Sequence, residues 1–449
     1  MHPLPKPKSF CECLLLVLLA GGALAAPPSP KPSDIAQKKS PMKIAHGSAN
    51  GEYEDVLVAP QVVRSRAATE IPPKAPASGS PTSYYCPYGN EQRNSRLATP
   101  LPAGTWKEIW KTEVLADFPP RFVLQGGDRI LIQAAVWQLF DAKGKTLAAE
   151  RSGPAPILMD TANQFLYFFD GVGQLTAHKL GDGQLAFSTS ANMADEGSYS
   201  LIARRGQKLL TAGSERQLDP HGHHRPENSK IEILDLGKPL EISKTGSLLS
   251  VKTVGSLSLT SNRILTAIQG ETVIAAALDH IVATDWQLSR TALFTSTFKP
   301  LTMSVDETGA IYLVIRDGAG VALWRVNTQG ERLYSVNLPK EMEDILTPPI
   351  VSHDHTAYLI AGNRLAAVSS QGVLLWEYKP ANPIAGGVVT GDDHLLLAVG
   401  PEVISFDAEG HSRVLSSFKE EVLSTPPILT SQNELLVASP SALHCLKAQ

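Results

Sequence analysis

The sequence predicts an all-β fold and, within that class, an eight-bladed β-propeller, with seven blades as the alternative. From Cys86 onward the chain reads as short alternating or wholly apolar strands separated by Gly, Asp and Asn turns. It has no long stretch of helical periodicity and no P-loop. One strand-and-turn phrase also recurs eight times in this region, at steps of 38 to 54 residues. Such a step suits one four-stranded antiparallel blade per copy.

The recurring phrase is a strand that ends in a tight turn. Its copies read AVWQLFDAKGK, GQLTAHKLGDGQ, SKIEILDLGKP, HIVATDWQLS, GVALWRVNTQGE, RLAAVSSQGV, EVISFDAEGH and SALHCLKAQ. Six copies carry a turn glycine, which adopts a positive φ without steric cost: Gly144, Gly183, Gly237, Gly330, Gly372 and Gly410. The fourth copy has Leu288 there. Two long steps could hide a merged blade, which would leave seven.

The sixth copy shows how each strand of a blade is assigned. PPIVSHD is expected to form the innermost strand, TAYLIAG the second, RLAAVSS the third and VLLWEYK the outermost. Proline suits the start of the first strand, where no ladder partner is needed for its missing N–H. Related starts occur as DFPPRFVL, GPAPILMD, FKPLTMSV and TPPILTSQNELLV. A single four-stranded sheet cannot hide both faces, so the blades must pack on one another in a closed ring.

Closure of the ring explains both ends of the repeat region. The eighth copy stops at Gln449 after its third strand, so it lacks an outer strand. The missing strand is predicted at Gly104 to Val114, GTWKEIWKTEV, which resembles the outer strand GVLLWEYKP. This segment would complete the eighth blade and leave no exposed edge at the seam.

The first 85 residues of the chain predict export and a tether. Two lysines precede the apolar run CECLLLVLLAGGALA, and Ala23-Leu24-Ala25 has the small-x-small form of a cleavage site. We interpret residues 1–25 as a signal peptide, with an N-terminal membrane anchor as the alternative. Residues 26–85 are rich in Pro, Ser and Lys and are expected to form a disordered linker. The apolar patch DVLVAPQVV inside it is either a docking peptide or collapsed linker, and residues 86–449 form the propeller.

Composition and charge narrow the partners without naming one. The chain has 449 residues, 43% of them hydrophobic, and a formal net charge of -4. This balance gives no basic signal for nucleic acid. No stretch after the signal peptide is apolar and long enough to span a bilayer. A secreted or periplasmic location and an unidentified protein or cell-envelope partner are expected.

Cysteine usage allows one internal disulfide in the mature chain. Cys11 and Cys13 lie upstream of the cleavage site, so only Cys86 and Cys445 remain. In an oxidising compartment they could join across the seam, stabilising the fold by roughly 4 to 5 kcal/mol. Alternatively, Cys445 is a small buried core residue and Cys86 a loop thiol.

These copies, with their paired prolines, third strands such as FDAKG and outer tryptophans, resemble the repeats of the pyrroloquinoline quinone (PQQ) dehydrogenases and their non-enzymatic relatives. The stretch YGNEQRNSRLATPLPAGTWKEIW is similar to the lead-in of many such proteins. The resemblance covers residues 86–449. It implies a propeller fold, but one fold hosts many activities.

The resemblance implies PQQ over calcium only for the enzymatic branch. Those enzymes place a carboxylate base near the quinone, and many add a disulfide between adjacent cysteines. This mature chain has no adjacent cysteines, no CxxCH haem attachment and no carboxylate cluster with calcium-loop spacing. We therefore expect no cofactor and a non-enzymatic protein, like the propeller subunit of the outer-membrane β-barrel assembly machinery. The alternative is a PQQ-dependent oxidoreductase acting on alcohols or sugars.

Two local clusters contain side chains that could bind a metal or take part in catalysis. LDPHGHHRPENSK contains His221, His223 and His224, which are weak candidates for zinc or copper. SHDHT places His353 and His355 at a turn on one rim of the ring, where polar residues are common. No GxSxG elbow is present, so no catalytic residue is assigned.

The tryptophans are interpreted as packing residues rather than as a ligand-stacking site. Trp110 and Trp376 fall on predicted outer strands, and Trp137 and Trp324 fall on predicted third strands. Bulky aromatics at these positions most often fill the space between blades. The sequence therefore predicts a secreted or periplasmic propeller that binds or scaffolds a partner through its loop faces.

Overall fold

A computed structural model describes residues 63–64, 92–115, 119–134, 136–151, 158–162, 164–169, 174–189, 198–218, 224–237, 247–249, 251–259, 264–277, 280–288, 291–295, 298–345, 347–419 and 421–449. The signal peptide and most of the linker lie outside these residues. The boundaries at residues 25 and 85 therefore stay predictions.

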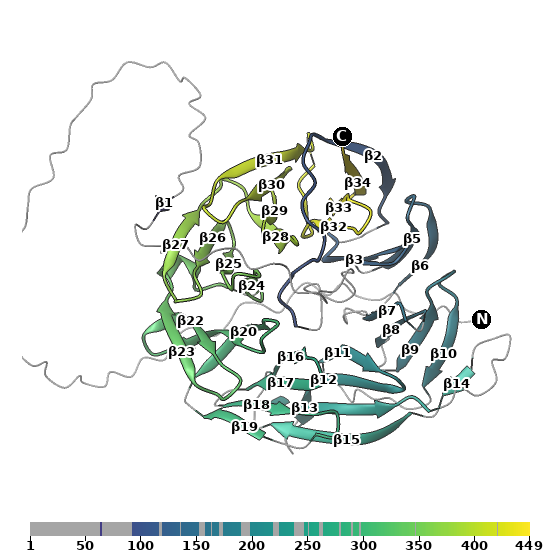
Figure 1. Ribbon diagram of the computed structural model, residues 1–449. Helices are drawn as coiled ribbons and strands as arrows, with labels where there is room; N and C mark the ends of the chain where they lie inside the picture. The colour runs from purple at the N-terminus through teal and green to yellow at the C-terminus, as the bar shows by residue number, and fades with distance from the viewer. Residues whose placement is uncertain are drawn as a thin grey trace, which may run out of the picture. The chain divides into compact units, whose positions relative to one another are not determined.

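Eight β-sheets stand around a ring (Figure 1). The eight-bladed prediction is confirmed, and the seven-bladed alternative is excluded. The described residues contain no α-helix, only the 3₁₀ turn η1 (Lys340–Met342). Each blade runs from an inner strand to an outer one in chain order, except in blade 8, where the ring closes, and at the outer edge of blade 6, where the early strand β1 is added.

The strands of blades 1 to 4 have the following bounds. Blade 1 contains β3 (Phe122–Gly126), β4 (Arg129–Gln133), β5 (Val136–Asp141) and β6 (Thr146–Arg151). Blade 2 contains β7 (Leu158–Asp160), β8 (Phe165–Phe169), β9 (Leu175–Lys179), β10 (Leu185–Thr189) and a fifth strand, β14 (Ser247–Leu249). Blade 3 contains β11 (Ser198–Arg205), β12 (Lys208–Leu218), β13 (His224–Asp235) and β15 (Lys252–Leu259). Blade 4 contains β16 (Leu265–Gln269), β17 (Thr272–Ala276), β18 (His280–Thr284) and β19 (Thr291–Thr295).

Blades 5 to 8 follow the same order. Blade 5 contains β20 (Lys299–Val305), β21 (Ile311–Asp317), β22 (Gly320–Val326) and β23 (Arg332–Asn337). Blade 6 contains β24 (Ile350–Val351), β25 (Ala357–Ala361), β26 (Arg364–Val368) and β27 (Leu374–Tyr378), with β1 (Val63–Arg64) at its outer edge. Blade 7 contains β28 (Ile384–Val389), β29 (Leu395–Val399), β30 (Glu402–Phe406) and β31 (Ser412–Ser417). Blade 8 contains β32 (Ile428–Leu429), β33 (Glu434–Ala438), β34 (Ala442–Ala448) and β2 (Trp106–Glu113).

The recurring phrase is the third strand and following turn of every blade. All six turn glycines have positive φ, from 60° to 83°. Leu288, which replaces glycine in the fourth copy, takes the same conformation with φ 59°. The turn therefore keeps the same backbone geometry even in the copy where leucine replaces glycine.

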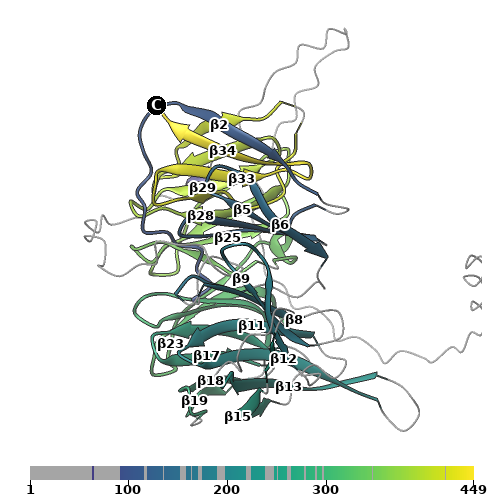
Figure 2. The ribbon, with the colours of Figure 1, turned by 90° about the vertical axis from the view of Figure 1, so that its right-hand side faces the viewer.

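The ring closes as predicted. β2 pairs antiparallel with β34 from Trp106 opposite Ala448 to Glu113 opposite Ala442. Backbone hydrogen bonds in both directions between Thr105 and Gln449, at 2.9 and 3.3 Å, extend the pairing to the last residue. Figures 1 and 2 show β2 lying beside β34, so the two ends of the repeat region form one sheet.

Aromatic side chains of one blade pack against the turn glycine of the next. A Cβ built at Gly410 would lie 2.9 Å from the Trp376 ring, and one at Gly372 would lie 2.7 Å from the ring of Tyr334. Trp376 also donates its indole N–H to the carbonyl of Ala408 at 3.1 Å. Trp137 and Trp324 are likewise buried. The prediction that tryptophans pack between blades is thus confirmed.

The segment 92–101, which we call the lead-in, crosses the inner strands of three blades. The Val305 N–H donates to Gln92, the Val351 N–H to Asn94 and the Val389 N–H to Ser95, at 2.9 to 3.1 Å. Asn94, Ser95 and Arg96 are at most 4% exposed. The lead-in is therefore an integral part of the inner face of blades 5 to 7.

Candidate ligand-binding cavity

A cavity of about 520 Å³ lies among the inner strands of blades 1, 6, 7 and 8. Residues at the starts of these strands line it, together with Ile360 of β25 and Ser95 of the lead-in. The lining residues are Ser95, Pro119, Pro120, Arg121, Phe122, Thr347, Pro348, Ile350, Ile360, Ala385, Gly386, Gly387, Ser424 and Pro426. A cavity of this size suits a small molecule or a few residues of a chain rather than a folded domain.

The repeated proline phrase builds this cavity. Pro120, Pro348 and Pro426 come from the starts of three inner strands and meet around the same space. Proline has no N–H to leave unsatisfied and presents a rigid apolar ring. The paired prolines therefore do more than start the inner strands. They also form a cavity wall that needs no hydrogen-bond partners at these positions.

Blade 7 contributes a wall without side chains. Gly386, with φ 150°, lies so close to Pro426 that a Cβ there would come within 2.6 Å of the proline ring. A Cβ at Gly387 would come within 2.5 Å of Leu397. Both positions thus require glycine, because neighbouring side chains of the protein occupy the space that a Cβ would need.

Arg121 is the one charged residue in the cavity lining. Arg121 is exposed, and no described residue forms an ion pair with it. The other polar side chains are the hydroxyls of Ser95, Thr347 and Ser424. A cation beside an apolar surface favours an anionic ligand with an apolar body.

The lining does not fit PQQ with calcium. Calcium takes six to eight oxygen ligands, usually including carboxylates. The described lining has no carboxylate, and its arginine would repel a divalent cation. It also lacks an acidic side chain that could serve as the base.

A second cavity of about 440 Å³ lies between blades 4 and 5, at the opposite ends of their inner strands. Its polar lining consists mainly of threonine, namely Thr272, Thr284, Thr308 and Thr328. Asp285 also lines it, but its carboxylate accepts the Gln287 N–H at 2.8 Å within its own turn. We assign no function to this cavity.

The SHDHT turn joins blade 6 to both neighbouring blades. The His353 ring lies 2.8 Å from Asp393 of blade 7, and the His355 ring lies 3.0 Å from Asp306 of blade 5. Asp306 also accepts the Ala310 N–H at 2.9 Å and lies 3.3 Å from Arg325. The two histidines are therefore engaged in contacts between blades, on the side of the ring away from the proline-lined cavity.

The environment of Asp306 keeps it ionised. Burial disfavours its charge, but the contact with His355 and hydrogen bonds from Thr308 and the Ala310 backbone outweigh burial and lower its pKa. At the neighbouring turn of blade 7, burial of Asp392 is likewise outweighed by the contact with His394 and by hydrogen bonds from Thr390 and the Leu101 backbone, and its pKa falls to about 2. Carboxylates held this way are poor proton acceptors, so Asp306 and Asp392 are not suited to act as general bases.

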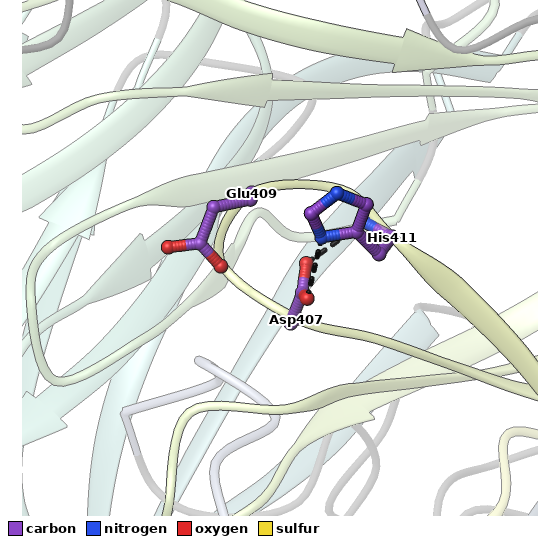
Figure 3. Close-up of side chains that lie close together, drawn as sticks. All are labelled: Asp407, Glu409 and His411. Carbon is purple, nitrogen blue, oxygen red and sulfur yellow. Dashed lines mark hydrogen bonds and ion pairs between the residues drawn. The ribbon is translucent and has the colours of Figure 1, made fainter.

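One group with metal-ligand chemistry occurs among the described residues, on the turn after β30. Asp407, Glu409 and His411 each offer a ligand atom within 4.8 Å of the others (Figure 3). Asp407 already accepts the backbone N–H of His411 at 2.7 Å and lies 2.8 Å from its ring. Asp141 and Asn327 accept the corresponding turn N–H groups in other blades. Asp407 is thus a turn residue of the repeat, and the exposed cluster is not assigned as a metal site.

The remaining candidates lie wholly or partly outside the described residues. His221 and His223 do so, and His224 is described only as the first backbone position of β13. The metal-binding hypothesis for these histidines therefore stays untested.

Cys86 also lies outside the described residues, whereas Cys445 is fully buried on β34. Burial raises the pKa of the Cys445 thiol to about 12. The disulfide between Cys86 and Cys445 stays a prediction. Peptide mapping under non-reducing conditions should find the two residues joined, and two unmodified thiols in oxidised protein would contradict it.

No family model and no curated protein matches the chain. Solved structures do match it. BamB from Moraxella catarrhalis aligns over 77% of this chain and 98% of its own, with TM-score 0.51 and 13% identity. A europium-containing methanol dehydrogenase aligns over 82% and 98%, with TM-score 0.57 and 10% identity. Sqt1 of Saccharomyces cerevisiae aligns over 79% and 100%, with TM-score 0.52 and 12% identity.

These likenesses concern the fold. They support the PQQ-like β-propeller fold that the repeats implied, and identities this low carry no function across. Among the described residues, no helix has the length and apolarity needed to cross a membrane.

Sequence reasoning missed two of the polar residues that line the cavity, Arg121 and Ser95. Arg121 follows the proline pair where Ile350 and Ile428 follow it in blades 6 and 8. This break in an otherwise apolar position was a readable signal. Ser95 offered none, because only the folded path of the lead-in brings it to the cavity.

Proposed function

We propose that this protein is a secreted or periplasmic, non-catalytic β-propeller that binds a protein partner at its proline-lined cavity. The chemistry of that cavity carries the proposal. Its side chains are apolar or hydroxylic apart from Arg121, so it has no group suited to act as a base. The signal-peptide pattern of residues 1–25 supports export.

The alternative is a PQQ-dependent oxidoreductase. The reason to test this alternative is the similarity in fold to a methanol dehydrogenase. Mixing the purified protein with PQQ and calcium distinguishes the non-catalytic proposal from the oxidoreductase alternative. We expect no stoichiometric quinone complex and no dye reduction with alcohols or sugars. A stoichiometric complex that turns over would overturn the non-catalytic proposal.

Binding itself can be tested with a photo-crosslinking amino acid placed at Phe122, in the cavity. The matched control places it at Leu333, which is 51% exposed on the outer strand of blade 5. After irradiation in the native compartment, we expect a discrete protein adduct from Phe122 and none from Leu333. Equal capture from both positions, or none from Phe122, would contradict a binding role for the cavity.

A further inference from the structure

The proline-lined cavity has a polarity that constrains its ligand. Its buried lining includes Pro120, Ile350 and Ile360, while Arg121 and Pro119 are exposed. The lining thus has an apolar interior and a cationic rim. A ligand that matches it inserts an apolar group and keeps a negative charge beside Arg121.

The lead-in obstructs one way through the ring. Ser95 lines the cavity, and its carbonyl accepts the Val389 N–H at 3.0 Å while the Leu97 N–H donates to the Val389 carbonyl at 2.8 Å. A chain entering beside blade 7 therefore meets a hydrogen-bonded segment. This arrangement favours a ligand that ends in the cavity over a chain that passes through it.

Two hydroxyl groups favour a polypeptide over a simple organic acid. The Thr347 hydroxyl reaches its acceptor, the Ile360 carbonyl, only at 3.5 Å, and the Ser424 hydroxyl reaches the Ala438 carbonyl only at 3.3 Å. Both hydroxyls can therefore also bond to backbone amides of a ligand.

We propose that the cavity binds the carboxyl-terminal end of a partner polypeptide. The last side chain, which is apolar, lies among the prolines and Ile350, and the terminal carboxylate pairs with Arg121. The preceding amides bond to Thr347 and Ser424 at the rim. This inference rests on the proposed function, because it names the chemistry recognised by the same cavity.

The test measures fluorescence anisotropy of hexapeptide pools with Leu, Val or Phe at the last position. One pool has a free carboxyl terminus and the other is amidated, and both are titrated with the full-length mature protein. We expect the free-carboxylate pool to bind at least about tenfold more tightly, because a charge-assisted hydrogen bond is lost on amidation. Equal binding of the amidated pool would overturn the proposal.

Two variants and a control locate the binding. Arg121→Gln should weaken binding of the free-carboxylate pool by about tenfold or more, and Ala385→Phe should abolish it by filling the cavity. Arg364→Gln is the control, since Arg364 begins β26 outside the cavity lining. Thermal unfolding of each variant shows that the ring is intact. Unchanged binding by folded Arg121→Gln and Ala385→Phe would place recognition elsewhere and overturn the proposal.

Competition with N-acetyl-leucine and with decanoic acid separates a peptide end from a small organic acid. Displacement of the peptides by either acid at equal concentration would overturn the polypeptide assignment. If no peptide binds while Phe122 still cross-links a protein, the carboxyl-terminus inference fails and the binding function stands. If neither experiment gives binding, both proposals fail.

Discussion

Gly410 and Trp376 show how a single residue joins two blades. The turn glycine has φ 83° and leaves room for the indole of the preceding blade. An alanine there would have to adopt a left-handed conformation and displace a buried ring as well. The interface between blades thus depends on the absence of one methyl group.

We predict that Gly410→Ala destabilises the protein more than Gly362→Ala. Gly362 also has positive φ, 57°, but no atom lies within 4 Å of a Cβ built there. Gly362→Ala should cost about 1 to 2 kcal/mol from backbone strain. Gly410→Ala should cost about 1 to 3 kcal/mol more, because it also overpacks the interface. Urea unfolding measures both values, and equal costs would mean that the indole contact is not tight.

Individual residues show which features a single sequence can predict. The turn glycines and Leu288 were predicted because they recur with the blade period. The pairs His355–Asp306 and His353–Asp393 were not, because each joins turns of different copies that only ring geometry brings together. The charge of Arg121 became interpretable only when the structure placed its strand beside the prolines of two other blades, Pro348 and Pro426.

At the scale of elements, the joint between β2, β34 and the loop before β32 combines backbone pairing with a charged network. His444 of β34 is 1% exposed and lies 2.7 Å from Glu108 and 3.1 Å from Glu421. Lys111 of β2 also pairs with Glu421. Side chains from the first and last strands of the ring thus meet on the same glutamate.

We predict that Glu421 makes the seam sensitive to acid. Burial opposes its ionisation, but hydrogen bonds from Lys111, Ser439 and His444 outweigh burial and lower its pKa to about 2. An unfolded glutamate titrates near about 4.3. Because the folded pKa is the lower one, the stabilisation is present above pH of about 4.5 and is lost as the pH falls toward about 2.

Glu421→Gln should therefore lower the melting temperature at pH 7, with a loss of about 1 kcal/mol after solvent screening. The difference from the unsubstituted protein should shrink as the pH falls toward 2. Glu409→Gln is the control, since this exposed turn carboxylate takes no part in the seam. A difference in melting temperature that is constant from pH 7 to pH 3 would contradict the assignment.

At the scale of the whole molecule, the repeat predicted the architecture almost completely. The order of strands in the sixth copy, the eight third strands and the closing strand all lie where the period placed them. The path of the lead-in was not predictable, because residues 92–101 belong to no repeat and are positioned by hydrogen bonds to three separate blades. The repeats thus determine the ring and the prolines of its cavity, whereas Arg121 and Ser95, which depart from the repeat pattern, add polar groups to that cavity.

The central claim is that the first and last strands complete one blade, and a cross-link across that seam tests it. Lys107 of β2 lies directly opposite Lys447 of β34, which in turn lies opposite Glu434 of β33. The Lys107→Cys/Lys447→Cys variant should form a disulfide between residues 107 and 447, found by non-reducing peptide mapping. The Lys107→Cys/Glu434→Cys control places the cysteines two strands apart, about 9 to 10 Å, which is too far. A disulfide in the first variant and none in the control is predicted; no 107–447 disulfide in folded protein would contradict the closed ring.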